Sequence, residues 1–207
     1  SAADTAGVRL SKTVDALAED LHRAIVEHQR WVDSLGREGR QAVLDAVELR
    51  WVDLRGKNLS GALLRGADLR GTSLAGALLI MADLSGGTLD GADLRGANLC
   101  GANLERASLV GADLTHARLG PANINGADGR PTGRQQPANL RFAVLRGALL
   151  PHCRLTDADL GGSDLTGADL SHADLDGADL TGATLTDARF DRTEPRGAKR
   201  AMSAGGE

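Results

Sequence analysis

The chain places a large apolar residue at every fifth position over most of its length. Leucine recurs at this spacing from Leu44 to Leu119 and is followed by Ile124; the register then slips by one residue and resumes from Leu140 to Phe190. Of these 28 repeats, 26 are centred on Leu, and the residue two before the centre is Ala in 21. Gly stands two residues after the centre in 16 repeats. A period this regular over so long a stretch restricts the chain to a repeating architecture.

A period of five matches neither the α-helix nor the flat β-strand. It fits a chain that turns a corner every five residues, with the central Leu and the small residue two before it pointing inward. Four sides of five residues close a coil of about 20 residues, so residues 20 apart stack at the β spacing of about 4.8 Å. Gly suits the corner because a type II turn needs φ > 0 at its third residue. The pattern therefore predicts an all-β solenoid.

Repeats such as Ala67–Gly71 (ADLRG) and Ala178–Gly182 (ADLTG) resemble the pentapeptide-repeat family over residues 42–192. The resemblance implies a right-handed quadrilateral β-helix. Its repeats give about seven coils and a rod roughly 34 Å long. The alternative, a leucine-rich-repeat solenoid, needs internally irregular units of about 20–29 residues.

Residues 1–41 precede the repeats and have a different pattern. Within residues 11–35, one histidine and several apolar residues recur at helical spacing, which predicts an amphipathic helix; they are Val14, Leu17, Leu21, Ile25, His28 and Val32. The helix is expected to cap the first coil, as terminal units do in solenoids; the alternative is a partner-binding or dimerising helix. Trp51 is expected to pack near Trp31. Lys57, at an inward position, is expected to distort its corner while its stem reaches solvent.

Two segments break the repeat. Residues 127–137 lack Leu and are rich in Gly, Pro and polar residues, which predicts a projecting loop with Arg130 and Arg134 as contact residues. The alternative is a tolerated insertion with no role. Residues 193–207 are expected to form a disordered tail. Since no C-terminal cap is evident, the last coil is expected to be exposed, which would allow a homodimer by end-to-end pairing.

Neither motifs nor composition indicate catalysis. His152 and His172 should share a column with Arg192, but no carboxylate or Cys completes a metal site there. Cys100 is expected to face outward and Cys153 inward, and neither has the surroundings of a nucleophile. A filled convex rod offers no cleft for an active site. We therefore expect no enzymatic activity, no cofactor and no metal.

Charge and hydropathy restrict the partners. The net charge of −4 argues against direct nucleic-acid binding. No apolar run of about 18 residues occurs, so no membrane contact is expected. Two Cys are too few for a disulfide framework, and no signal peptide opens the chain, so a cytoplasmic location is expected.

The most uneven surface feature is an acidic end. Residues 155–188 carry eight Asp and no Lys or Arg. The candidate contact residues there are Asp159, Asp164, Asp169, Asp174 and Asp179. Because Qnr-type quinolone-resistance members of the family mimic DNA, the resemblance implies a candidate role in binding and modulating or protecting a type II topoisomerase, either DNA gyrase or topoisomerase IV.

The competing hypothesis is a generic protein-interaction scaffold without a topoisomerase role. It uses the projecting loop and an outward apolar patch formed by Leu78, Ile80 and Met81, with Cys100 stacked beside Ile80. Clustered apolar residues on an otherwise polar rod are typical of a partner site.

Overall fold

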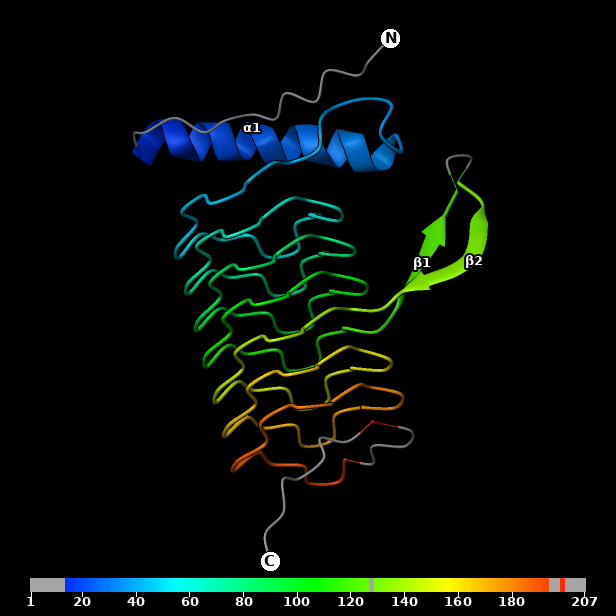
Figure 1. Ribbon diagram of the computed structural model, residues 1–207. Helices are drawn as coiled ribbons and strands as arrows, with labels where there is room; N and C mark the ends of the chain where they lie inside the picture. The colour runs from blue at the N-terminus through cyan, green and yellow to red at the C-terminus, as the bar shows by residue number, and fades with distance from the viewer. Residues whose placement is uncertain (1–13, 127–128, 194–197, 200–207) are drawn as a thin grey trace, which may run out of the picture.

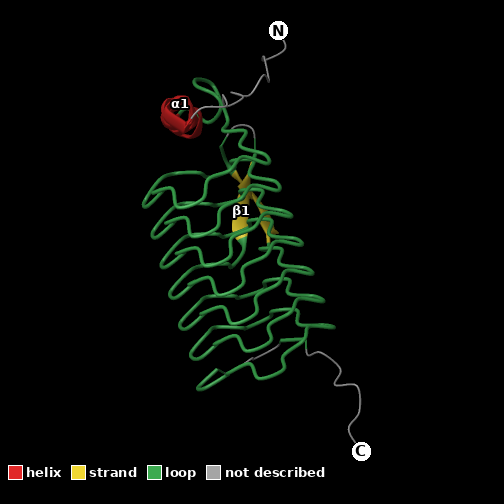
Figure 2. Cartoon of the chain, turned by 90° about the vertical axis from the view of Figure 1, so that its left-hand side faces the viewer, coloured by secondary structure: helices red, strands yellow, loops and turns green. Residues whose placement is uncertain are grey.

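The computed structural model describes residues 14–126, 129–193 and 198–199. The repeats build a rod, helix α1 (Val14–Asp33) lies across its N-terminal end, and a hairpin of β1 (Ala122–Asn125) and β2 (Pro131–Gln136) leans out from its side (Figure 1). The two hairpin strands pair antiparallel. The view at 90° shows the coils stacked as parallel layers with α1 seen end-on (Figure 2).

Single parallel bridges between residues 20 apart hold the coils together. Glu48 bridges to Asp68, and Asp68 bridges to Thr88. The centre residue also bonds to the next coil, as where the Leu69 amide donates to the Thr88 carbonyl at 2.7 Å. Each wall between two corners is short, so the ladder consists of bridges rather than long strands. We name the four sides by their first centre residue: side A begins at Leu44, side B at Leu49, side C at Leu54 and side D at Leu59.

The core is a stack of leucines and alanines. Leu44, Leu94 and Leu160 are fully buried, and so are inward alanines such as Ala97. Burying a Leu side chain contributes about 1.5–3 kcal/mol, and the small inward residue leaves room for the Leu of the adjacent side. The predicted inward and outward positions of the repeat are thus the observed ones.

Helix α1 is joined to the rod by a buried histidine and a glycine. His28 is fully buried, stacks on Trp31 at 5.5 Å between ring centroids, and accepts a hydrogen bond at Nδ1 from the Ala42 amide at 3.0 Å. Burial lowers the pKa of His28. At Gly39 (φ +70°) the connector crosses the helix so closely that a Cβ would lie 2.2 Å from the Glu27 carbonyl oxygen. The lead-in to the repeats therefore holds α1 against the first coil.

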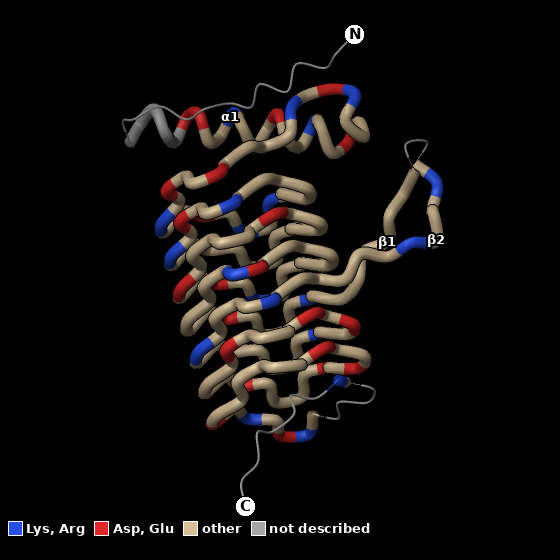
Figure 3. The backbone as a smooth tube through the Cα atoms, viewed as in Figure 1, with Lys and Arg blue, Asp and Glu red and all other residues tan. Residues whose placement is uncertain are grey.

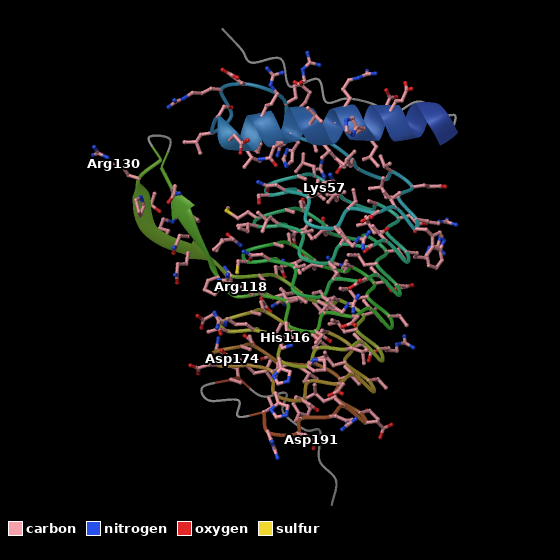
Figure 4. The ribbon with its side chains drawn as sticks, turned by 180° about the vertical axis from the view of Figure 1, so that it is seen from behind. Lys57, His116, Arg118, Arg130, Asp174 and Asp191 are labelled. Carbon is pink, nitrogen blue, oxygen red and sulfur yellow. The ribbon has the colours of Figure 1, made fainter. Side chains whose placement is uncertain are left out.

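Two expectations for the first coil are wrong. Trp51 is 79% exposed and covers the corner at Gly71, whereas Trp31 lies against the corner at Gly61, which follows a different side. The Lys57 side chain is exposed, and the corner beside it is not distorted. Lys57 belongs to the first coil, so no earlier coil covers this inward position and it opens toward α1. The Lys57 side chain therefore lines a cavity of about 490 Å³ between α1 and the first coil. Figure 4 shows Lys57 at this end of the rod.

The break in the repeat begins earlier than predicted. Asn103 bridges to Asn139, 36 residues on instead of 20, so 16 residues leave the coil. Ile124 is therefore not a core centre but lies in β1, and Leu140 takes the expected place. Pro121 explains the exit: it falls at the corner position that needs φ > 0, which proline cannot adopt. The predicted loop 127–137 includes β2 but misses β1.

The ladder continues beyond the predicted end of the repeats. Lys199, inside the segment predicted to be a disordered tail, bridges to Asp179 and donates its amide to the Ala178 carbonyl at 2.9 Å. At Lys199 the prediction of disorder is therefore wrong. Residues 194–197 and 200–207 lie outside the described residues.

Candidate interaction surfaces on the rod

The five candidate acidic residues do not share a face. Each precedes the centre of its repeat, and consecutive repeats point to consecutive sides. Asp159 and Asp179 bridge to each other on side A, whereas Asp164, Asp169 and Asp174 lie on sides B, C and D. The acidic end is therefore a ring around the rod.

Most of this ring is paired with basic residues of neighbouring coils. Salt bridges join Arg141 to Asp159 at 3.3 Å, Arg146 to Asp164 at 2.8 Å, Arg189 to Asp169 at 3.8 Å and Lys199 to Asp179 at 3.4 Å. Hydrogen bonds from Thr166, and secondarily Arg146, hold the pKa of Asp164 below its usual range. These basic residues lie outside the 155–188 window, so a count along the sequence misses them.

One acid of this ring, Asp174, and two acids outside it are left unpaired. Asp157, Asp174 and Asp176 are exposed, and none of them forms a salt bridge with a described residue. Asp174 and Asp176 stand on the wall and first corner position of side D, and Asp157 covers the following corner at Gly177. Figure 3 shows acidic positions gathered on the lower coils below the hairpin.

The three residues of the predicted apolar patch lie on side D, close to the foot of the hairpin. Leu78 is 38% exposed, Met81 is 44% exposed and Ile80 is partly exposed. Met81 and Ala122 both crowd the corner at Gly101. Cys100, predicted to face outward, is only 8% exposed, since the neighbouring corner is covered by the hairpin foot.

The hairpin is stabilised by its own polar contacts. The Thr132 hydroxyl donates to the Ile124 carbonyl at 2.6 Å, and the Gln135 amide donates to Asn123 at 3.1 Å. Arg134 is exposed on β2, and Figure 4 shows Arg130 at the hairpin tip, directed away from the rod. Gly129 lies close to the connector that follows α1, because a Cβ on Gly129 would lie 3.7 Å from Leu35 Cδ1.

A column of three histidines follows side C. The rings of His116 and His152 stack at 4.9 Å, and those of His152 and His172 stack at 4.7 Å. The sequence predicted only the lower pair, because the 16 inserted residues hide the register of His116. Counting 36 residues across the break would have found it.

The described residues contain no cluster of three or more His, Cys, Asp or Glu placed to hold a metal ion. Burial strongly raises the pKa of the Cys153 thiol, which keeps it protonated at neutral pH. Over the same residues, no helix has the length and apolar character needed to cross a bilayer.

Comparison with known proteins gives a consistent result. A family model described as pentapeptide repeats matches residues 58–96, 92–128, 138–173 and 163–194, more than half of the chain. No curated protein matches.

Solved structures of pentapeptide repeat proteins are similar to the chain. HetL of the cyanobacterium Nostoc sp. strain PCC 7120, involved in heterocyst differentiation regulation, is 29% identical over 83% of this chain and 92% of its own, with a TM-score of 0.36. Full-length QnrB1, a plasmid-mediated fluoroquinolone resistance protein, is 21% identical over 77% of this chain and 84% of its own, with a TM-score of 0.40. A protein of the Arabidopsis thaliana thylakoid lumen is 31% identical over 59% and 71%, with a TM-score of 0.28.

Proposed function

The chain belongs to the pentapeptide-repeat family, which implies a right-handed β-helix, and we propose that it is a non-enzymatic scaffold that binds a protein partner through side D and the hairpin. In this proposal residues 42–192 form about seven coils, residues 1–41 supply the capping helix, and the chain acts in the cytoplasm.

The apolar patch beside the hairpin is the observation that carries the proposal. Leu78, Ile80 and Met81 lie together in one coil of side D, while the residues of the same coil on side C, Ser73 and Ala75, are small. Exposed apolar residues that cluster on a polar surface mark interaction sites, since their burial by a partner is favourable. The hairpin adds a projecting edge next to the patch, which enlarges the area that a partner can cover.

Binding assays on two matched variants test this proposal. Ile80→Asp puts a charge into the patch, and Val110→Asp makes the same change at the equivalent corner position of side B, where Val110 is 40% exposed. A partner captured by the parent should be lost with Ile80→Asp and kept with Val110→Asp. Equal retention by both variants contradicts a contact through the patch.

A second candidate function is DNA mimicry directed at DNA gyrase or topoisomerase IV. The unpaired acids Asp157, Asp174 and Asp176 favour it, because carboxylates without a basic partner are free to meet a basic groove. We propose these three acids, in place of the ring of five predicted from the sequence, as the contact surface for a topoisomerase.

Supercoiling assays with two triple variants separate this candidate from the first. Changing Asp157, Asp174 and Asp176 to Asn should abolish an effect of the parent on gyrase. Changing Asp159, Asp164 and Asp179 to Asn removes the same number of charges but only from paired acids, so the effect should persist. No effect of the parent on either topoisomerase removes this candidate.

The C-terminal coil is proposed as a homodimer contact. Leu185, Ala188 and Phe190 pack against the core but are only partly buried. Sedimentation velocity of the parent and of Phe190→Asp tests it, with a loss of the dimer expected in the variant.

A further inference from the structure

Two neighbouring columns on the C-terminal half of the rod combine imidazoles and guanidiniums. His116 and His152 occupy the corner between sides C and D. Arg118 and Arg154 occupy the wall of side D and bridge to each other in adjacent coils. Each Arg follows its His by two residues, with one inward residue between them, so all four side chains point outward. We name His116, Arg118, His152 and Arg154 the basic block.

The two arginines differ from Arg189, the third described arginine at a wall position. Arg118 and Arg154 are exposed and form no ion pair with any described residue. Asp174, the next residue of the same column, instead accepts a hydrogen bond from the Thr156 hydroxyl at 3.0 Å. By contrast, Arg189, at the wall position of side C, contacts Asp169 and Asp191. Arginines at the first corner position, directly after the centre residue, also contact a carboxylate within 4 Å; they are Arg50, Arg55, Arg65, Arg70, Arg95, Arg141 and Arg146.

This arrangement is electrostatically unfavourable as it stands. Like charges directly opposite each other in neighbouring strands are destabilising. Bridged residues of adjacent coils lie about 5 Å apart, so the two guanidiniums repel each other. Asp174 stands opposite Arg154 in the following coil, but no carboxylate stands opposite Arg118, whose other bridge is to Asn98.

The histidine column is unfavourable for a different reason. The same corner carries Gly56, Gly76 and Gly96 in the upper coils, as the positive φ requires. His116 and His152 hold that conformation at φ of +60° and +57°. A side chain costs free energy there, as at the other corners of the rod that lack Gly, such as Arg106 and Phe142. The backbone conformation therefore gives no reason for histidine at these two corners.

We propose that the basic block binds a small ligand that carries one or two phosphate groups. Guanidinium groups bind phosphate oxygens through two parallel hydrogen bonds, and imidazoles add N–H donors beside them. A bound phosphate removes the repulsion between Arg118 and Arg154. The block supplies donors from two coils, which matches a ligand with two linked phosphates.

The surroundings favour a small anion over a nucleic acid. Proteins that bind DNA neutralise a run of phosphates, on the order of 6–10. Here Asp174 and Asp176 follow the block on side D, and Asp113 and Asp169 stand on the wall before the corner. A long polyanion would meet these carboxylates in turn, whereas a ligand the size of pyrophosphate spans only the two coils of the block.

Basic side chains continue below the block. His172 and Arg192 extend the corner column. Asp169 and Asp191 lie near the lower end of this column, and both pair with Arg189, at 3.8 and 2.9 Å. Neither carboxylate is therefore left without a basic partner at that end.

Calorimetry and histidine NMR on the full chain test the proposal, with pyrophosphate and orthophosphate as probes at constant ionic strength. The double variant Arg118→Gln/Arg154→Gln should bind pyrophosphate about tenfold more weakly or worse. The control Arg95→Gln/Arg146→Gln removes the same charge from paired positions and should bind like the parent. In the parent, the signals of His116 and His152 should shift and that of His22 on α1 should not.

The probes also distinguish the sources of phosphate. Tighter binding of pyrophosphate than orthophosphate indicates a diphosphate ligand, and equal binding indicates a single phosphate group; both support the site. The proposal is overturned if neither probe saturates at millimolar concentration, or if both double variants lose affinity equally. Tighter binding of a short DNA duplex through the same arginines also overturns it, in favour of a nucleic-acid surface.

Discussion

Sides B and D share one core and one ladder but differ in their surfaces. On side B, Asp68 lies 2.6 Å from both Arg50 and Arg70, and Arg146 pairs with Asp164. On side D, the wall holds exposed Leu78, the unpaired Arg118 and Arg154, and the unpaired Asp174. The hairpin leaves the rod at the corner that follows side D.

The backbone does not cause this difference. The Leu69 amide of side B and the Leu79 amide of side D each donate to the next coil at 2.7 Å. The backbone ladder is thus the same on both sides at these positions, which leaves the outward residues free to vary. The contrast between paired charges on side B and unpaired groups on side D supports our proposal that side D is the functional face.

The largest expected effect tests whether the two sides share one core. Leu89→Ala on side B and Leu99→Ala on side D each leave a cavity around a fully buried residue. Each should lower the free energy of unfolding by about 2–5 kcal/mol. Urea denaturation measures both. A large loss on one side with almost none on the other would show that the sides differ inside as well as outside.

Removing the hairpin should have a smaller effect. Deleting residues 122–137 with Pro121→Gly restores the 20-residue spacing and gives the corner a residue that accepts φ > 0. The free energy of unfolding should change by about 1 kcal/mol or less, since the hairpin bonds mainly to itself.

Deleting only residues 127–137 is the matched control. That variant keeps a five-residue register through Ile124 but leaves Pro121 at a corner it cannot form. It should be less stable than the longer deletion by circular dichroism melts. Equal stability of the two would contradict the role assigned to Pro121.

Much of the fold was predictable from local chemistry. The period of five located the buried Leu94 and Ala97, because each inward position has one fixed requirement for size. Ile124 was misassigned because it keeps the spacing, although Pro121 three residues earlier signals the exit. The lead-in of His28 and Gly39 was visible as a pattern, but the hydrogen bond to Ala42 depends on how α1 crosses the coil.

The surfaces were harder to predict, because pairing depends on residues in neighbouring coils. Asp164 looks isolated in the sequence, yet Arg146 reaches it from the coil before. Arg154 looks like one more wall arginine, and only the stack places it next to Arg118. The 16 residues inserted at the hairpin hide the relation of Arg118 to Arg154 from a fixed 20-residue comparison, whereas Arg146 and Asp164 both follow the break.

Removing single arginines sharpens the comparison of the two sides. Arg146→Gln on side B breaks an exposed pair and should lower the free energy of unfolding by about 0.2–1 kcal/mol. Arg154→Gln on side D breaks no ion pair; it relieves repulsion from Arg118 and loses the attraction of Asp174 in the following coil, so stability should change little. Thermal melts at low and high salt check this, because salt screens both effects. A loss with Arg154→Gln as large as with Arg146→Gln would show that Arg154 has a stabilising partner.

The smallest expected effect is a pH dependence confined to side B. Hydrogen bonds from Arg70, and secondarily Arg50, hold the pKa of Asp68 below its ordinary value of 3.8. A carboxyl whose pKa is lowered by folding stabilises the protein above the unfolded pKa, and this contribution is lost as the pH falls through the folded value. Asp68→Asn should therefore cost a few tenths of a kcal/mol at pH 7, because the pair is solvent-screened, and the cost should shrink below about pH 4. Arg154→Gln should show no such change over the same range, since no carboxylate is paired with it. Urea denaturation of both variants and the parent from pH 7 to 2 measures this, and a cost of Asp68→Asn that stays constant to pH 2 would mean that the ion pair contributes nothing to side B.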